Sequence, residues 1–238
     1  AVLSMLDPEL AVRDLEEVLR DGARLVMLRP GPIYGTSPAD RRYDAFWARL
    51  NEARVPGIYH VAQSGYTHWY AKEWGEDPDI NDQEMTPFHA FTCFAQRPVQ
   101  DTILNIAQRN LFGRFPNLQV VSVENGSGWV KPLLAVDHHL QLSVRTRGGT
   151  FDRGGDFIQR PLLDTLRDHL WVSPYPEEDP GEVIEILGEE RVLFGSDYPH
   201  PEGLAEPRAY VQQLEGFSDA SVRRIMRENT AGLLGLAA

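Results

Sequence analysis

Six short apolar runs recur along the chain, and nearly all of them are followed by a segment with helical periodicity. Each run is four to six residues long and apolar on both faces, which is typical of buried parallel strands. The runs lie at 1–5, 25–28, 57–61, 118–123, 169–172 and 191–194. A strand, a helix and a further strand make a parallel crossover unit, so this series predicts an α/β fold.

The segments between the runs carry helix signals. Asp7 and Pro8 supply an N-terminal cap and a first helical residue, and Gly22 supplies a stop. The last helix has Ser218 or Asp219 as its cap. Further helices are expected at 43–53, 98–112, 130–140, 161–167, 180–187 and about 220–234. Two segments are expected to be loops, namely residues 62–97 and the Gly- and Arg-rich residues 145–160.

Two architectures accommodate such a series, a doubly wound open sheet and a (β/α) barrel. A (β/α)8 barrel has eight strands and typically about 250 residues. Six runs in 238 residues, with the first at residue 1, predict one incomplete TIM-barrel-like domain over 1–238, truncated at its N-terminus, with about six of the eight strands. An open parallel sheet exposes unpaired edges, so a homo-oligomer is expected.

Composition limits the kinds of partner and environment that the sequence predicts for this chain. Asp and Glu number 35 against 23 Lys and Arg, a net charge of −12, and no basic patch occurs. This charge repels phosphate backbones and argues against nucleic-acid binding. No apolar stretch approaches the roughly 18 residues of a membrane span, and the first residues lack a secretory signal. The single cysteine, Cys93, excludes an intrachain disulfide and is typical of the reducing cytoplasm.

Polar side chains follow the apolar runs at the points where parallel strands would end. Arg29 follows the second run, His60 closes the third and Glu124 follows the fourth. Asp197 and His200 follow the sixth run. In parallel α/β folds these ends gather at one edge of the sheet, so His60, Glu124 and Asp197 are expected to converge there. Imidazole and carboxylate groups are ligands for a divalent ion such as zinc, and a second carboxylate can transfer the proton of metal-bound water.

Each of these residues also has a simpler interpretation. His60 can be a hydrogen-bonded core histidine, and Glu124 can cap the following helix. Asp197, between Ser196 and Tyr198, can be a turn former. Arg29 can form an ion pair at the rim of the sheet.

The long loop also carries candidates whose roles stay open. His68 and His89 suit a lid or an uninvolved surface. The aromatic residues Trp69, Tyr70 and Trp74 suit a cover over the site, a subunit interface or packing of the loop, and packing is favoured.

The segment Arg191-Val-Leu-Phe-Gly-Ser-Asp-Tyr-Pro-His200 resembles the last-strand motif of the amidohydrolase-related family. The resemblance is to the branch that includes aminocarboxymuconate-semialdehyde decarboxylase and related aromatic-acid decarboxylases. It extends over essentially the whole chain through supporting segments. These are Val55-Pro56 before the run ending in His60, Arg114-Phe-Pro-Asn-Leu118, and Ile225-Met-Arg-Glu-Asn229 with Leu233-Leu234.

The resemblance implies a distorted barrel with a divalent metal at its mouth, held by His60 and Asp197, with Asp197 also handling a proton. Two departures stand out. The chain has no His-x-His pair, which supplies two further ligands in the family. Glu124 occupies the place of a histidine that acts as catalytic acid or base in the family, so Glu124 either takes over that role or marks a subgroup with altered chemistry.

Two functions follow as hypotheses. The first is a metal-dependent hydrolase or non-oxidative decarboxylase of a small cyclic or aromatic carboxylated compound. In it His60 and Asp197 bind zinc or another divalent ion, Glu124 and Asp197 are catalytic, and Arg29 or His200 binds the substrate carboxylate. The second is a catalytically inactive fragment, or a binding or oligomerisation module of the same fold, because two ligands hold zinc weakly where catalytic sites use three.

Overall fold

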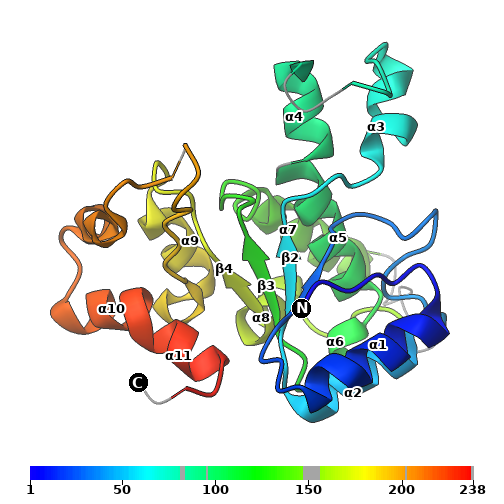
Figure 1. Cartoon of the computed structure of the whole chain (residues 1–238), viewed down its shortest axis with the longest axis horizontal. Coiled ribbons are helices and arrows are strands. Elements are labelled where there is room, and N and C mark those ends of the chain that lie inside the picture. The colour runs from blue at the N-terminus through cyan, green and yellow to red at the C-terminus, as the bar shows by residue number, and fades with distance from the viewer. Residues whose placement is uncertain (81–83, 95, 147–155, 202, 237–238) are drawn as a thin grey trace.

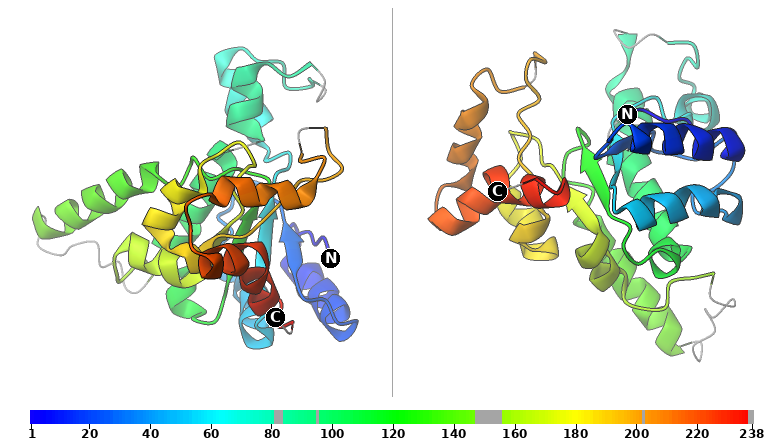
Figure 2. Two further views of the ribbon diagram at one scale, coloured as in Figure 1. Left: turned by 90° about the vertical axis from the view of Figure 1, so that its left-hand side faces the viewer. Right: turned by 60° about the horizontal axis from the view of Figure 1, so that its bottom comes forward.

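The structure, a computed structural model, describes residues 1–80, 84–94, 96–146, 156–201 and 203–236 (Figures 1 and 2). At its centre is a four-stranded parallel sheet in the order β1-β2-β3-β4, with each strand paired to the next one in the chain. The strands are β1 (Val26–Leu28), β2 (Gly57–His60), β3 (Val120–Val123) and β4 (Leu170–Val172). The predicted parallel α/β architecture is therefore confirmed, and the sheet is open rather than closed into a barrel.

The first and last predicted strands lie along the two edges of this sheet. Val2 forms a parallel bridge with Met27, and Val192 forms one with Val172. Each edge segment makes only an isolated bridge, so neither qualifies as a strand of the sheet. The spatial order of the six runs still follows their order in the sequence, as in a barrel wall.

Helices follow most of the strands and pack on the sheet. The α-helices are α1 (Pro8–Arg20), α2 (Asp44–Ala53), α3 (Tyr66–Trp69), α4 (Pro87–Cys93), α5 (Gln96–Gln108), α6 (Leu111–Arg114), α7 (Pro132–Thr146), α8 (Leu162–His169), α9 (Pro180–Leu187), α10 (Asp219–Arg223) and α11 (Asn229–Leu233). The 3₁₀ turns are η1 (Arg41–Tyr43), η2 (Ala71–Trp74), η4 (Glu189–Arg191) and η5 (Pro207–Leu214), and η6 (Arg224–Glu228) is a π-helix. None of the helices in the described ranges is long and apolar enough to cross a membrane.

The predicted cap residues take their expected places. The carboxylate of Asp7 accepts from the backbone N–H groups of Glu9 and Leu10 at the start of α1. Ser218 accepts from the N–H of Ser221 at the start of α10. These contacts satisfy donors that the first turn of a helix leaves free, which is why the sequence locates both helix starts.

The segment 62–97 differs from its prediction as a loop. It contains α3, η2, α4 and the start of α5, and α3 and α4 project away from the sheet (Figure 1). The Tyr70 ring stacks on Phe88 with centroids 6.4 Å apart, and Trp74 lies 5.9 Å from Phe88. Helices of four to seven residues depend on such tertiary packing, and a window that short shows no periodicity in the sequence.

Two other boundaries also differ. The helix expected over 98–112 is divided into α5 and α6, because Asn110 between them is left-handed with φ 53°. The helix expected over 130–140 begins and ends later, as α7. Most of the predicted loop 145–160 lies outside the described residues, and its first two residues end α7.

The two faces of β2 have different surroundings. A Cβ at Gly57 would lie 3.7 Å from the Trp47 ring and 3.9 Å from Leu50, so this face is covered by α2. Because side chains alternate along a strand, Tyr59 shares the α2 face and His60 points to the other. Tyr59 is 1% exposed.

The C-terminal helical run anchors the last edge segment. The backbone N–H of Phe194 donates to the carbonyl oxygen of Ile225 in the π-helix, at 3.3 Å. The amide of Asn229 donates to the carbonyl oxygens of Glu189 and Val192 at 2.8 and 2.7 Å. These bonds place the segment that leads to Asp197 against the edge of β4.

Candidate metal centre at the carboxyl end of the sheet

His60 and Glu124 meet at the ends of neighbouring strands. His60 closes β2, and Glu124 directly follows Val123, the register partner of His60. The Nε2 atom of His60 lies 2.7 Å from Oε2 of Glu124. The Nδ1 atom lies 2.8 Å from the carbonyl oxygen of Val61, which can only accept, so Nδ1 carries a proton. This bond fixes the ring and leaves Nε2 as the atom that faces Glu124.

Asp197 and His200 complete a cluster with Glu124. One ligand atom from each of these three residues lies within 4.8 Å of the other two. Nδ1 of His200 is 3.9 Å from Oδ2 of Asp197. The side chains of Glu124 and Asp197 are 18% and 20% exposed, whereas His200 is 56% exposed. Segments that follow β2, β3 and the Val192 edge therefore meet at one end of the sheet.

This donor set fits a divalent cation. Carboxylate oxygens and imidazole nitrogens are the usual ligands of zinc and of manganese, and the atoms that converge here are of these two kinds. The group in the structure is not identical to the predicted pair of His60 and Asp197. Glu124 and His200 join Asp197 in it, and His60 is attached through its contact with Glu124.

Both acidic residues of the cluster have strained backbones. Glu124 and Asp197 are left-handed, with φ 58° and 55°, a conformation that is uncommon outside glycine and clusters at functional sites. A helix-capping role for Glu124 is wrong, because α7 begins only at Pro132 and the Glu124 carboxylate faces His60. Asp197 does lie in a turn, since its carbonyl oxygen accepts from the N–H of His200 at 2.9 Å.

Close packing fixes the backbone of the Asp197 turn. A Cβ at Gly203 would lie 2.5 Å from the Asp197 carbonyl oxygen. The N–H of Leu204 donates to the Ser196 carbonyl oxygen at 2.8 Å. A Cβ at Gly195 would lie 2.4 Å from the hydroxyl of Ser173. Only glycine allows these close approaches, so the turn requires a glycine on both of its sides.

Glu178 and Tyr175 hold the loop that follows Glu124. The Tyr175 hydroxyl donates to the backbone oxygen of Glu124 at 3.0 Å. Oε2 of Glu178 accepts from the N–H and hydroxyl of Ser127 at 2.7 and 3.0 Å and from the N–H of Tyr175 at 2.9 Å. Its Oε1 accepts from the N–H of Gly128 at 3.0 Å. Neither Glu178 nor Tyr175 is a candidate from the sequence alone.

The raised pKa of the Tyr175 hydroxyl indicates the electrostatic potential of the site. Burial raises the pKa of its hydroxyl to about 12, with further contributions from the nearby carboxylates of Glu124, Glu178 and Asp197. Negative charge therefore accumulates around the cluster. Such a potential attracts a cation.

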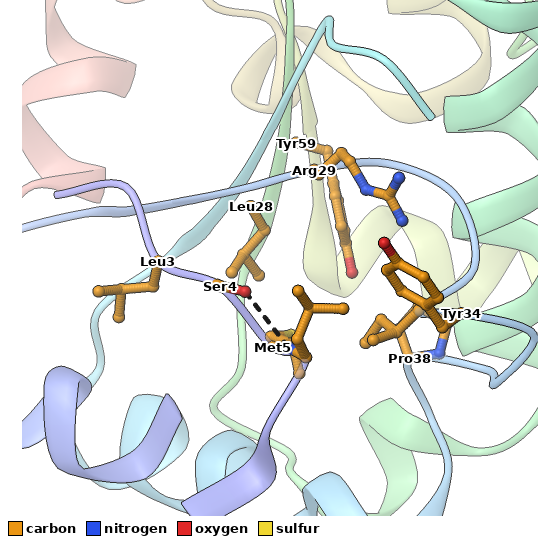
Figure 3. Close-up of a pocket in the computed structure, with 10 residues that line it drawn as sticks. Leu3, Ser4, Met5, Leu28, Arg29, Tyr34, Pro38 and Tyr59 are labelled. Atoms are coloured by element: carbon orange, nitrogen blue, oxygen red, sulfur yellow. Dashed lines mark hydrogen bonds between the residues drawn. The ribbon is translucent and has the colours of Figure 1, made fainter. Parts of the chain in front are cut away.

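Arg29 lies apart from this cluster. Its guanidinium donates to the carbonyl oxygens of Gln63 and Pro32 at 3.2 and 2.5 Å, and desolvation lowers its pKa. It forms no ion pair with any residue that the structure describes, so the predicted rim ion pair is wrong. Arg29 instead lines a separate cavity (Figure 3).

The remaining candidates also lie outside the cluster. His68 is exposed on α3, and His89 is buried on α4 with Nε2 3.0 Å from the Thr67 hydroxyl. The contacts of Tyr70 and Trp74 with Phe88 agree with the packing interpretation of the aromatic residues.

Comparison with known proteins establishes the class. The amidohydrolase family model matches residues 1–236, and the chain belongs to this family. The resemblance inferred from the last-strand motif is therefore confirmed.

The relatives that this chain matches are longer than the chain itself. The chain is 24% identical over 158 residues to 2-amino-3-carboxymuconate-6-semialdehyde decarboxylase of Dictyostelium discoideum, a match of 62% of this chain and 37% of that protein. An amidohydrolase from Mycobacterium avium subsp. paratuberculosis K-10 superposes with a TM-score of 0.84 at 36% identity, over 98% of this chain and 57% of that one. The 2,6-dihydroxybenzoate decarboxylase from Rhizobium superposes with a TM-score of 0.72 at 16% identity, over 99% and 70%. The last match shows a shared fold, and the chain spans about two fifths to three fifths of the first two relatives.

Proposed function

We propose that this chain contributes a divalent-metal centre to a carboxy-lyase or hydrolase that acts on a small cyclic or aromatic carboxylated compound. The observation that carries the proposal is the convergence of Glu124, Asp197 and His200 within 4.8 Å, with His60 on Glu124. The decarboxylase relatives favour carbon dioxide release over hydrolysis.

His60 and Asp197 are the proposed ligands, and Glu124 and His200 are close enough to join them. A bound divalent ion supplies Lewis-acid polarisation of the substrate and lowers the pKa of coordinated water toward about 7. Both zinc and manganese suit these donors. Manganese is present in structures of a dihydroxybenzoic acid decarboxylase from Polaromonas sp. JS666 and a 5-carboxyvanillate decarboxylase from Novosphingobium aromaticivorans DSM 12444, which favours manganese as the first ion to test.

Glu124 is the proposed proton carrier. In a decarboxylation the bond between the ring carbon and the carboxylate breaks, carbon dioxide leaves and the electron pair stays on the ring carbon. The protonated carboxyl of Glu124 then gives its proton to that carbon, and a later proton from solvent restores it. In a hydrolysis the ionised Glu124 takes a proton from the attacking water instead.

His200 is the proposed partner of the substrate carboxylate, whereas Arg29, which the sequence also offers for this role, lies apart from the cluster. His200 lies within the cluster and is the most exposed of its residues, which suits contact with an incoming molecule. Arg29 faces the cavity of Figure 3, where it has a different proposed ligand below.

Substitution of Asp197 by Asn tests the metal centre. Asn keeps the shape and turn propensity of Asp but lacks its charge, so Asp197→Asn should reduce manganese and zinc affinity roughly tenfold or more and leave folding almost unchanged. Calorimetric metal titration and thermal unfolding measure both. Asp21→Asn, at the exposed C-terminal cap of α1, is the matched control and should change neither.

Carbon dioxide release from a panel of hydroxybenzoates then measures activity, with and without manganese. Metal affinity that is equal in the parent chain and the Asp197→Asn variant would leave Asp197 as a turn former and remove the central residue of the proposal. A parent chain that binds neither ion would favour the non-catalytic binding or oligomerisation module. Light scattering tests the accompanying proposal of a homo-oligomer formed through the open edges of the sheet.

A further inference from the structure

A cavity of about 370 Å³ lies beside the N-terminal edge of the sheet (Figure 3). It is enclosed by residues 3–6, the end of β1 and the loop that follows β1. Its polar lining residues include Arg29, Tyr34 and Tyr59. A volume of this size is within the range of cavities that bind small molecules.

The cavity and the metal centre are on opposite faces of β2. Tyr59 lines the cavity from the face that α2 covers, and its neighbour His60 carries the contact with Glu124 on the other face. Alternation of side chains along the strand separates the two. The cavity is therefore a site of its own, and the inference below does not depend on the proposed function.

The hydroxyl of Tyr59 is the most informative group in the cavity. It is fully buried and has no hydrogen-bond partner among the described residues. In Figure 3 the Tyr59 side chain lies among the residues that line the cavity, with its hydroxyl below the guanidinium of Arg29 in this view. A buried hydroxyl without a partner destabilises a protein, and buried polar groups nearly always have one, so this hydroxyl is a candidate to bind a ligand.

Arg29 supplies the charge. A guanidinium has five N–H donors, and Arg29 uses one on Gln63 and one on Pro32. These two bonds hold the group in place at the mouth of the cavity and leave donors for a further acceptor. No carboxylate of the described residues neutralises it. Tyr34, 78% exposed and left-handed with φ 44°, adds a second hydroxyl on the same side.

Most of the remaining lining is apolar. It includes Leu3, Met5, Leu28, Ile33 and Pro38, whose side chains offer no hydrogen bonds. An occupant with a charged end and an apolar body matches this mixed lining.

We propose that this cavity binds a small organic anion with an apolar body, of the size of an aryl carboxylate. Its carboxylate accepts from the guanidinium of Arg29 and from the hydroxyls of Tyr59 and Tyr34, and its apolar part lies against Leu28 and Met5. Charge-assisted hydrogen bonds of this kind are stronger than neutral ones, which makes the affinity depend on the charge of the ligand.

Benzoate, with benzamide as its uncharged counterpart, is the probe. Calorimetry on the full chain should show benzoate binding at least tenfold tighter than benzamide. Tyr59→Phe removes only the hydroxyl and should weaken benzoate binding at least fivefold, and Arg29→Met should do the same. The free Tyr59→Phe variant should be as stable as the parent or more stable, because it removes an unpartnered polar atom.

Matched controls separate binding from folding. Tyr210 is also buried with an unpartnered hydroxyl but lies outside the cavity, so Tyr210→Phe should leave benzoate affinity unchanged. Arg13→Met, on the exposed side of α1, is the control for Arg29. Benzamide binding as tightly as benzoate would overturn the proposal. So would benzoate affinity within twofold of the parent in either Tyr59→Phe or Arg29→Met.

The metal centre is the other place where benzoate can bind. His200→Ala and Asp197→Asn test this, and each should leave benzoate affinity unchanged in metal-free buffer. Loss of binding in these variants would place benzoate at the metal centre and overturn the cavity proposal. Failure of the metal titration with intact benzoate binding would overturn only the proposed function.

Discussion

Replacing Glu178 by alanine should weaken both the fold and the proposed metal centre. Its carboxylate accepts four hydrogen bonds, three of them from backbone N–H groups of Ser127, Gly128 and Tyr175. The alanine variant leaves these donors without an acceptor. Because Ser127 and Gly128 follow Glu124 by three and four residues, the loop that positions Glu124 loses its main attachment.

The size of the effect follows from burial. Ser127 is 7% exposed, so its N–H and hydroxyl lose a buried, charge-assisted acceptor, whereas Gly128 is exposed and can bind water. A buried donor left unsatisfied costs about 1–3 kcal/mol, and a hydrogen bond to a charged group contributes a similar amount. We expect Glu178→Ala to lower the free energy of unfolding by about 3 kcal/mol. For a chain of this length that corresponds to a fall in Tm of about 6–12 °C.

Glu178→Gln should fall between the parent and the alanine variant. Glutamine keeps one oxygen acceptor but presents an amide donor to the remaining N–H group, and we expect a loss of about 1–1.5 kcal/mol. Urea unfolding measures stability, and manganese titration measures the effect on the centre. Glu177→Ala, one residue earlier and exposed, is the control and should stay within about 0.5 kcal/mol of the parent. Equal stability of Glu178→Ala and Glu177→Ala would refute this account of the loop.

Two further perturbations test the same region. Gly126 has φ 64°, and a Cβ there would lie 2.8 Å from the Tyr175 ring. We therefore expect Gly126→Ala to lower the free energy of unfolding, measured in urea, by about 2 kcal/mol more than Gly22→Ala does. Gly22 is the matched control, because its φ is 87° and a Cβ there would have nothing within 4 Å. Equal losses would show that the ring moves aside freely. Because the pKa of Tyr175 is raised to about 12, the folded chain holds this proton more tightly than the unfolded chain does. Its contribution to stability is complete below about pH 10 and should be lost as pH rises from 10 to 12. A Tyr175→Phe variant with the same alkaline decline as the parent would contradict this assignment.

The sequence predicts the strands of the sheet and much of the candidate metal centre, because both depend on local signals in the chain. Apolar runs locate β1 to β4 and both edge segments, and Asp7 and Ser218 mark helix starts by short-range hydrogen bonds. The convergence of His60, Glu124 and Asp197 follows from the rule that parallel strands end together. Their roles in metal binding and catalysis stay predictions.

The parts that the sequence does not predict depend on long-range contacts. Glu178 is 51 residues from Ser127, and a glutamate after a turn carries no motif that reveals this bond. The sequence predicts His200 only as a partner of the substrate, because a spacing of three residues from Asp197 does not show that its ring reaches the carboxylates. The short helices over 66–93 are stabilised by aromatic contacts between α3, η2 and α4, and their sequence alone contains too few turns to be periodic.

The anchoring of the last edge segment by the C-terminal helices sets an order of assembly during synthesis. A chain leaves the ribosome N-terminus first, so β2 and β3, which carry the contact between His60 and Glu124, emerge well before Asn229. The bonds from Asn229 to Val192 and from Phe194 to Ile225 can form only after the helical run has been made. Asp197 precedes Asn229 by 32 residues, which takes roughly 2–6 s at ribosomal rates of about 5–20 residues per second. During that interval His60 and Glu124 have been synthesised but the segment that carries Asp197 lacks its anchor, so the proposed set of metal ligands can be completed only after Asn229 has been made.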